Sequence, residues 1–213
     1  MDKKFRKFKV AVCLNIILIV LGIIGAVFSF KENQFVMFKY YTQDSNFLGL
    51  LSSMLFVITG ISSLKAGKLK TVEFVSKLRF MAVCCMCLTF LVVIFVLIPI
   101  AGFDWTCWYL FKGSSLFYHT LCPIIGFVSF AAFEDVVNLR FANACFNAIP
   151  TVIYAIITIT LNALYIIDGP YAFLKVHDQS ILMSVIWFIL IVGGSWLIAI
   201  LIYLLKKKNL KVN

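Results

Sequence analysis

Charged residues are scarce in this sequence. Asp, Glu, Lys and Arg make up 13% of its 213 residues, whereas a typical soluble domain contains about 25%. Hydrophobic residues account for 63% of the chain and aromatic residues for 16%. This composition excludes a soluble enzyme, a nucleic-acid-binding domain and a disulfide-stapled secreted module.

Residue types that bind metals are also few or unsuitably placed. The chain has two histidines and seven cysteines, and the spacing of the cysteines is not typical of a metal site. Cys84, Cys85 and Cys87 lie in the middle of an apolar stretch with no histidine near them in the sequence, so we interpret them as small packing residues. We predict neither a metal site nor a cofactor.

Long apolar runs, in contrast, are abundant. Six stretches contain no formal charge, and each has at least about 18 residues, which is enough to cross a hydrocarbon core roughly 30 Å thick. The connecting segments have 9 to 15 residues, too few for a separate soluble domain, and the alternating pattern of a porin-like strand is absent. The sequence therefore predicts an all-α polytopic membrane protein, a single domain over residues 1–213 with six transmembrane helices. The predicted spans are residues 10–30, 46–64, 80–103, 113–133, 147–167 and 179–205.

The distribution of basic residues predicts the topology. Of the 19 Lys and Arg residues, 15 lie before the first stretch, in the second and fourth connections, and after the last stretch. Because such residues concentrate on the cytoplasmic side of membrane proteins, we expect both termini in the cytoplasm. We interpret the net charge of +10 as a membrane signal and expect no nucleic-acid partner. Lys exceeds Arg by 16 to 3, which favours an AT-rich bacterial genome and hence the plasma membrane.

Polar residues inside the stretches are the candidates for function. Most are small or hydroxylated, and such residues commonly let membrane helices pack closely. His119 differs because it is the only histidine inside a stretch, and a buried imidazole needs a hydrogen-bond partner. Pro123 follows four residues later and cannot donate to the carbonyl of His119, so we expect the helix to kink there.

Thr42 and His119 form the candidate catalytic pair, because both are expected in the outer half of the membrane. A hydroxyl activated by an imidazole is a nucleophile for acyl transfer, and unpaired N–H groups at a helix N-terminus stabilise an oxyanion. A site at this depth faces acyl chains, which points to a lipid ester. Thr42 has a second interpretation as the N-cap of the second helix. Asp44, Asn46 and Asn162 are candidates for orienting the pair or contacting the substrate.

Three segments of the sequence are distinctive: residues 40–46 (YYTQDSN), 119–123 (HTLCP) and 169–174 (GPYAFL). Together, and in this order, they resemble segments of the androgen-induced family of multi-pass membrane hydrolases and its bacterial relatives. The resemblance implies a six-helix threonine hydrolase, with Thr42 as nucleophile and His119 as base. Characterised animal members cleave fatty acid esters of hydroxy fatty acids. Ala172 stands where the family loop usually has a second proline, and the spacing from His119 to Pro123 is shorter than in animal members.

The sequence leaves three functions open. The favoured one is an intramembrane lipid ester hydrolase whose partner is a membrane lipid or another fatty-acyl ester. A non-catalytic lipid-binding or scaffold protein would explain everything except the shared depth of Thr42, Asn46, His119 and Asn162. A small transporter would need a continuous polar path, but we expect no charged residue in the inner halves of the helices. The sequence does not predict an oligomeric state.

Overall fold

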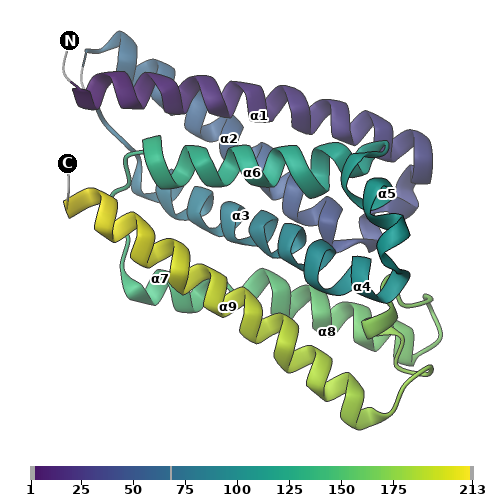
Figure 1. Cartoon of the computed structure of the whole chain (residues 1–213). Helices are drawn as coiled ribbons and strands as arrows, with labels where there is room; N and C mark the ends of the chain where they lie inside the picture. Colours follow the sequence, from purple (N-terminus) through teal and green to yellow (C-terminus); the bar gives the residue numbers. More distant parts are fainter. Residues whose placement is uncertain (1–2, 68, 212–213) are drawn as a thin grey trace.

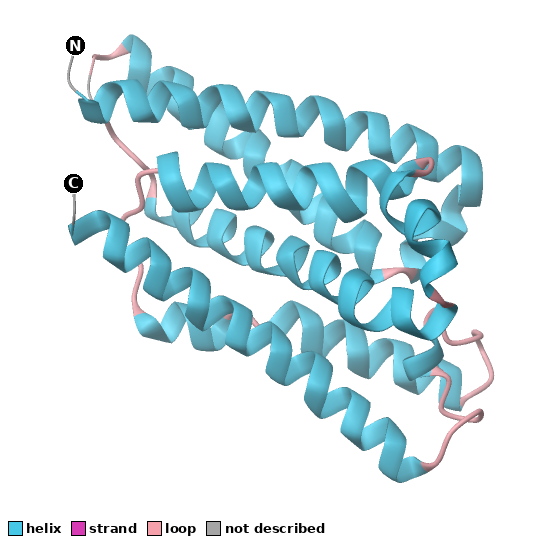
Figure 2. Cartoon of the chain, in the orientation of Figure 1, coloured by secondary structure: helices cyan, strands magenta, loops and turns pink. Residues whose placement is uncertain are grey.

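Helices form every regular element in the described part of the chain (Figure 2). The structure is a computed structural model that describes residues 3–67 and 69–211. Six of its helical segments are long and apolar enough to cross a membrane. The prediction of an all-α, six-span membrane protein is therefore confirmed, whereas the cytoplasmic placement of the termini stays a prediction.

The spans are joined by short connections and interrupted by short helical turns. Several spans continue from an α-helix into a 3₁₀ or π turn without a break in the helical run. In chain order the elements are α1 (Lys3–Asn33), η1 (Gln34–Lys39), α2 (Tyr41–Lys65), α3 (Glu73–Val92), η2 (Val93–Leu97), α4 (Ile98–Ala101), η3 (Phe103–Trp105), α5 (Thr106–Phe111), η4 (Leu116–Leu121), α6 (Cys122–Val128), η5 (Ser129–Phe133), α7 (Phe141–Phe146), α8 (Ile149–Ala163), η6 (Ala172–Leu174) and α9 (Ile181–Lys211).

α3 lies at the centre of the bundle, where it contacts α2, α6 and α9. Its side chains Phe80, Val83 and Met86 are completely buried. Both chain ends lie at one end of the bundle, called here the terminal end, while α4, α5 and the loop before α9 lie at the opposite end, called the site end (Figure 1). The bundle thus has two chemically distinct ends.

α9 packs tightly over only part of its length. Near the terminal end its residues Ala199 and Ile202 are buried in the core, but near the site end Ile181 and Leu182 are 86% and 70% exposed. In Figure 1 this helix crosses the other spans obliquely. Its site-end half is therefore the least enclosed part of the bundle.

One expectation about charge is wrong. α3 begins at Glu73 rather than near residue 80, so Arg79 belongs to the third span and is completely buried. Its Nη2 lies 2.7 Å from Oε1 of Glu134, whose side chain is also buried. A buried charge is tolerated when it is paired and hydrogen-bonded, and each of these residues satisfies the other.

Neutral side chains complete the surroundings of this ion pair. Ser53 accepts a 2.9 Å hydrogen bond from Nη1 of Arg79. Asn15 and Ser129 each donate to Oε1 of Glu134, also at 2.9 Å. The cluster connects α1, α2, α3 and the end of η5, and it replaces the uncharged inner half that the sequence predicted.

Candidate active site

Thr42 is the second residue of α2 and is 6% exposed. Tyr40 occupies the N-cap position of that helix, so the interpretation of Thr42 as the N-cap is wrong. Its Oγ1 instead lies 3.4 Å from Nε2 of His119 and 3.4 Å from the Tyr171 hydroxyl. The predicted pair, contributed by the second and fourth spans, is thus brought together.

The second ring nitrogen of His119 determines which tautomer faces Thr42. Nδ1 lies 2.7 Å from the carbonyl oxygen of Tyr109, and because a carbonyl can only accept, Nδ1 carries the proton. In the neutral ring Nε2 then has a lone pair directed at the Thr42 hydroxyl. The distance of 3.4 Å between Nε2 and Oγ1 of Thr42 is slightly longer than the roughly 2.6–3.2 Å over which a proton is transferred. Catalytic hydrogen bonds commonly shorten when substrate binds.

His119 lies in the π-helical turn η4, immediately before α6, which has Pro123 at its start. Where we expected a kink, the structure has a π-helical turn. Its hydrogen bonds join residues five apart, such as Cys122 and Phe117, and this spacing accommodates the missing N–H of Pro123. Thr120 fastens the same turn to α5 by donating a 2.8 Å hydrogen bond to the carbonyl of Leu110. Two adjacent side chains of η4 thus anchor it to α5.

Asn46 connects the helices that carry the pair. Its Nδ2 donates to the carbonyl of Thr42 at 2.8 Å and to the carbonyl of Tyr118 at 3.1 Å. The residue is 3% exposed, and it links the first turn of α2 to the residue before His119. Asn46 therefore joins α2 to η4, and its role in orienting the pair stays a prediction.

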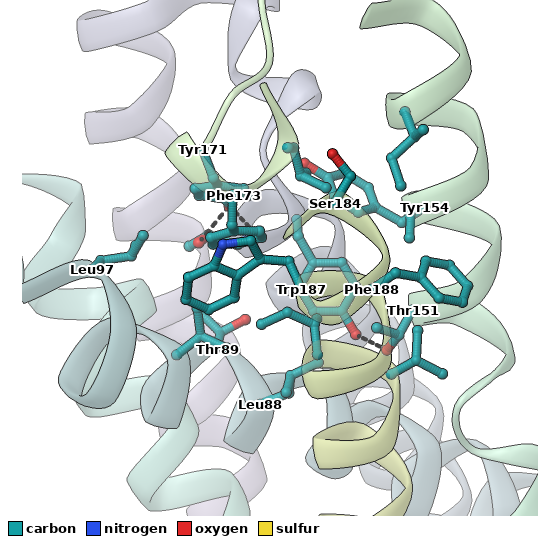
Figure 3. A pocket seen from close by; sticks show the side chains of 18 of the residues that line it. Leu88, Thr89, Leu97, Thr151, Tyr154, Tyr171, Phe173, Ser184, Trp187 and Phe188 are labelled. Atoms are coloured by element: carbon teal, nitrogen blue, oxygen red, sulfur yellow. Dashed lines mark hydrogen bonds between the residues drawn. The ribbon is translucent and has the colours of Figure 1, made fainter. Parts of the chain in front are cut away.

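Tyr171 is the site residue that sequence reasoning missed. The hydroxyl of Tyr171 accepts a 3.4 Å hydrogen bond from the backbone N–H of Thr42. Its ring stacks on Phe173 with 5.1 Å between centroids (Figure 3). Burial raises the pKa of Tyr171 to about 12, so the hydroxyl keeps its proton near neutral pH and remains a donor. Its place in the segment 169–174 was the available signal.

Among the residues that the structure describes, neither Asn162 nor Asp44 hydrogen-bonds to Thr42 or His119. Asn162 binds both ends of the loop that carries Tyr171: its Nδ2 donates to the carbonyl of Ile167 at 3.0 Å, and its Oδ1 accepts from the N–H of Val176 at 2.8 Å. The structure thus gives Asn162 a role in shaping the loop. Asp44 is exposed and lines a separate open cavity beside α8.

Two cavities meet at Thr42 and Tyr171. The outer cavity has a volume of about 610 Å³, and His119, Gln43 and Trp108 also line it. The second, which we call the apolar slot, lies between α2, α3, α8 and the site-end half of α9 (Figure 3). Its volume is about 40 Å³, enough for a few water molecules, so a longer occupant requires its side chains to move apart. The Thr42 hydroxyl therefore stands between a roomy, partly polar space and a narrow apolar one.

Comparison of the chain with protein-family models, with curated protein sequences and with solved structures found no match. The resemblance to the androgen-induced family accordingly stays a prediction from the three segments.

Proposed function

We propose that this multi-pass membrane protein hydrolyses lipid esters, with Thr42 as nucleophile and His119 as general base. The observation that supports this function is the chain of contacts from the Thr42 hydroxyl through the His119 ring to the carbonyl of Tyr109. A nucleophile, a base and a group that orients the base form the arrangement that covalent acyl transfer requires. Its position where two cavities join gives an ester two places for its two halves.

The chemistry balances with these groups and water alone. Oγ1 of Thr42 attacks the ester carbonyl while Nε2 of His119 takes the hydroxyl proton, and the Tyr171 hydroxyl donates to the resulting oxyanion. The C–O bond to the alcohol breaks as His119 returns the proton to the leaving oxygen. His119 then deprotonates a water molecule, which attacks the acyl-threonine. The acyl C–Oγ1 bond breaks as His119 returns that proton to Oγ1, and the carboxylic acid is released.

The substrate class follows from the lining of the two cavities. The apolar slot suits the first methylenes of an acyl chain, and Trp187 and Phe188 of α9 form one of its walls. Because the slot is narrow, a full chain enters only if the weakly packed site-end half of α9 moves outward. The outer cavity, with its polar and aromatic lining, would hold the alcohol portion of the ester.

The basic residues support a location for this reaction. The segments that contain 15 of the 19 Lys and Arg residues adjoin the terminal end of the bundle. By the positive-inside rule that end faces the cytoplasm, with both termini inside. The proposed reaction then takes place in the outer leaflet of the plasma membrane of a bacterium.

Covalent labelling tests the proposed nucleophile directly. A fluorophosphonate probe bearing an alkyl chain is expected to modify the wild-type protein in detergent, and peptide mass spectrometry should find the adduct on Thr42. The Thr42→Ala variant should remain unlabelled, whereas labelling at another residue, or equal labelling of both proteins, would contradict the assignment.

Replacing Tyr171 by phenylalanine is expected to lower kcat about 10- to 100-fold. The change removes the hydroxyl that lies 3.4 Å from Thr42 Oγ1 but keeps the ring stacked on Phe173. Loss of one strong oxyanion donor lowers kcat by about 10²–10³-fold. Steady-state hydrolysis of a chromogenic acyl ester measures the effect. Tyr40→Phe is the matched control, because it removes a neighbouring hydroxyl on the same cavity without changing a contact to Thr42; an equal loss in both variants would refute the role of Tyr171.

A further inference from the structure

Another cavity, of distinct chemistry, opens at the terminal end, where α1 and α9 approach the segment that follows η5. Its volume is about 300 Å³. Lys3, Lys4 and Lys7 of α1 line it together with Lys206 of α9. These lysines come from opposite ends of the sequence, so the fold, rather than one basic run, creates the concentration of charge.

The lysines outnumber the acidic groups in this cavity. Only Glu134 and Asp135 among the lining residues carry negative charge. Glu134 is already paired with Arg79 at 2.7 Å, and Lys4 lies 3.5 Å from Asp135. The cavity is therefore positive overall, which favours an anionic occupant.

Lys206 is a buried and hydrogen-bonded part of the cavity lining. It is 3% exposed, and its ammonium group donates to the carbonyls of Phe130 and Glu134. These contacts fix the end of α9 to the terminus of η5, and they place a positive charge beneath the cavity. Residues Lys3 and Lys7 are one helical turn apart on α1 and hence share a face.

The remaining lining is apolar apart from Asn209, whose Nδ2 donates to the carbonyl of Ala131. The apolar residues are Phe8, Leu69, Ala131, Ala132 and Phe133. A free inorganic anion would gain nothing from this surface, whereas a molecule with a phosphate attached to a hydrophobic portion would contact both parts. Both features occur at the terminal end of a bundle whose helices are long and apolar enough to cross a membrane.

We propose that this cavity binds the head group of an anionic phospholipid from the leaflet at the terminal end. The phosphodiester lies against Lys3 and Lys7, with Lys206 supplying charge from below, and the glycerol and first methylenes contact Phe133 and Leu69. Basic pockets between membrane helices recognise anionic lipids in this way. The site is on the opposite end of the bundle from Thr42, so it does not depend on the hydrolytic function.

Thermal unfolding of the purified full chain in a neutral detergent tests the site. Phosphatidylglycerol is titrated against the protein, with phosphatidylcholine as the neutral lipid, and each curve gives an apparent affinity. We expect phosphatidylglycerol to raise the Tm of the wild type. The Lys3→Gln/Lys7→Gln variant should bind it about 30-fold more weakly, since two lysines near an anionic surface contribute about 1 kcal/mol each. Lys3→Arg/Lys7→Arg should retain binding because it keeps both charges.

The matched control is Lys65→Gln/Lys208→Gln, which removes two exposed charges at the same end of the bundle but outside the cavity. An equal loss of affinity in this control would show general surface attraction and overturn the proposal, as would no preference for phosphatidylglycerol in the wild type. Glycerol phosphate, which has no acyl chains, distinguishes a site for a lipid phosphate from a site for a soluble phosphate. It should stabilise the protein much less than the lipid; equal stabilisation would assign the cavity to a soluble phosphate and refute the lipid site.

Discussion

Thr42→Ala is expected to reduce lipid-ester hydrolysis by at least about 10³-fold, because without Oγ1 no acyl-enzyme can form. Thr42→Ser should retain measurable activity, since it keeps a hydroxyl at the same position on α2. The hydrolysis rate of His119→Gln should be about as low as that of Thr42→Ala, because this substitution removes the base that lies 3.4 Å from Oγ1. Release of free fatty acid from a defined ester in detergent micelles measures all three variants.

Thr59→Ala is the matched control for this series. Thr59 lies on the same helix, and its hydroxyl donates only to the carbonyls of Leu55 and Phe56. Its removal should leave activity within about twofold of the wild type, because the residue lies several turns from the site. Each variant should also show an unchanged thermal unfolding midpoint, so that lost activity is not mistaken for lost fold.

A double variant distinguishes a catalytic pair from two residues that each help to bind substrate. If Thr42 and His119 act as a unit, Thr42→Ala/His119→Gln should be no slower than either single variant, as groups that serve one step are strongly non-additive. Independent binding contributions would instead multiply. A product of the two single losses, or full activity in either single variant, would refute the proposed mechanism in which Thr42 and His119 act as a unit.

The spans were predictable because they depend on a local property. Each is a run of apolar residues, and burial in a hydrocarbon core selects for length and composition alone. The meeting of Thr42 and His119 was also predictable, since chain direction and residue count fix the depth of a residue in a membrane helix. The short connections then made neighbouring helices antiparallel, which limited the possible partners.

The groups around the pair could not be deduced in the same way. The orienting partner of His119 is a backbone carbonyl at Tyr109, and every residue has such a group, so no residue type marks it. Tyr171 reaches Thr42 through the path of an irregular loop, which Asn162 holds at both ends. The path of a loop depends on tertiary contacts rather than on sequence periodicity. The sequence therefore did not reveal that Asn162 holds this loop, and Asn162 was expected to orient the pair or contact the substrate.

The buried ion pair was missed for a different reason. Arg79 and Glu134 each lie one residue outside a predicted apolar stretch, where charges normally belong to loops. Their pairing becomes visible only when the start of α3 and the end of η5 are placed side by side. Whether a charged residue at the edge of a span lies in a loop or in a buried ion pair can therefore be decided only when the neighbouring helix is placed.

Breaking this ion pair is expected to destabilise the protein strongly. In Arg79→Met the Glu134 carboxylate would stay buried without its cation, and loss of one member of a buried pair costs about 3–5 kcal/mol. Chemical or thermal unfolding in detergent micelles measures the change. Lys77→Met is the matched control, because Lys77 on the same helix pairs with Glu73 on the exposed surface, where an ion pair contributes little.

The double variant Arg79→Met/Glu134→Gln should recover part of the lost stability, because it removes the uncompensated charge as well as its partner. Acid provides an independent test. Burial alone would raise the pKa of Glu134, but the charge of Arg79 and hydrogen bonds from Arg79, Asn15 and Ser129 hold it below its ordinary value of 4.5. The stabilising contribution is therefore complete above about pH 4.5 and is lost as the pH falls through the lowered folded-state pKa. Without Arg79 this acid-dependent loss should shrink or reverse, and an Arg79→Met protein as stable as the wild type at neutral pH would show that the pair does not hold the terminal end together.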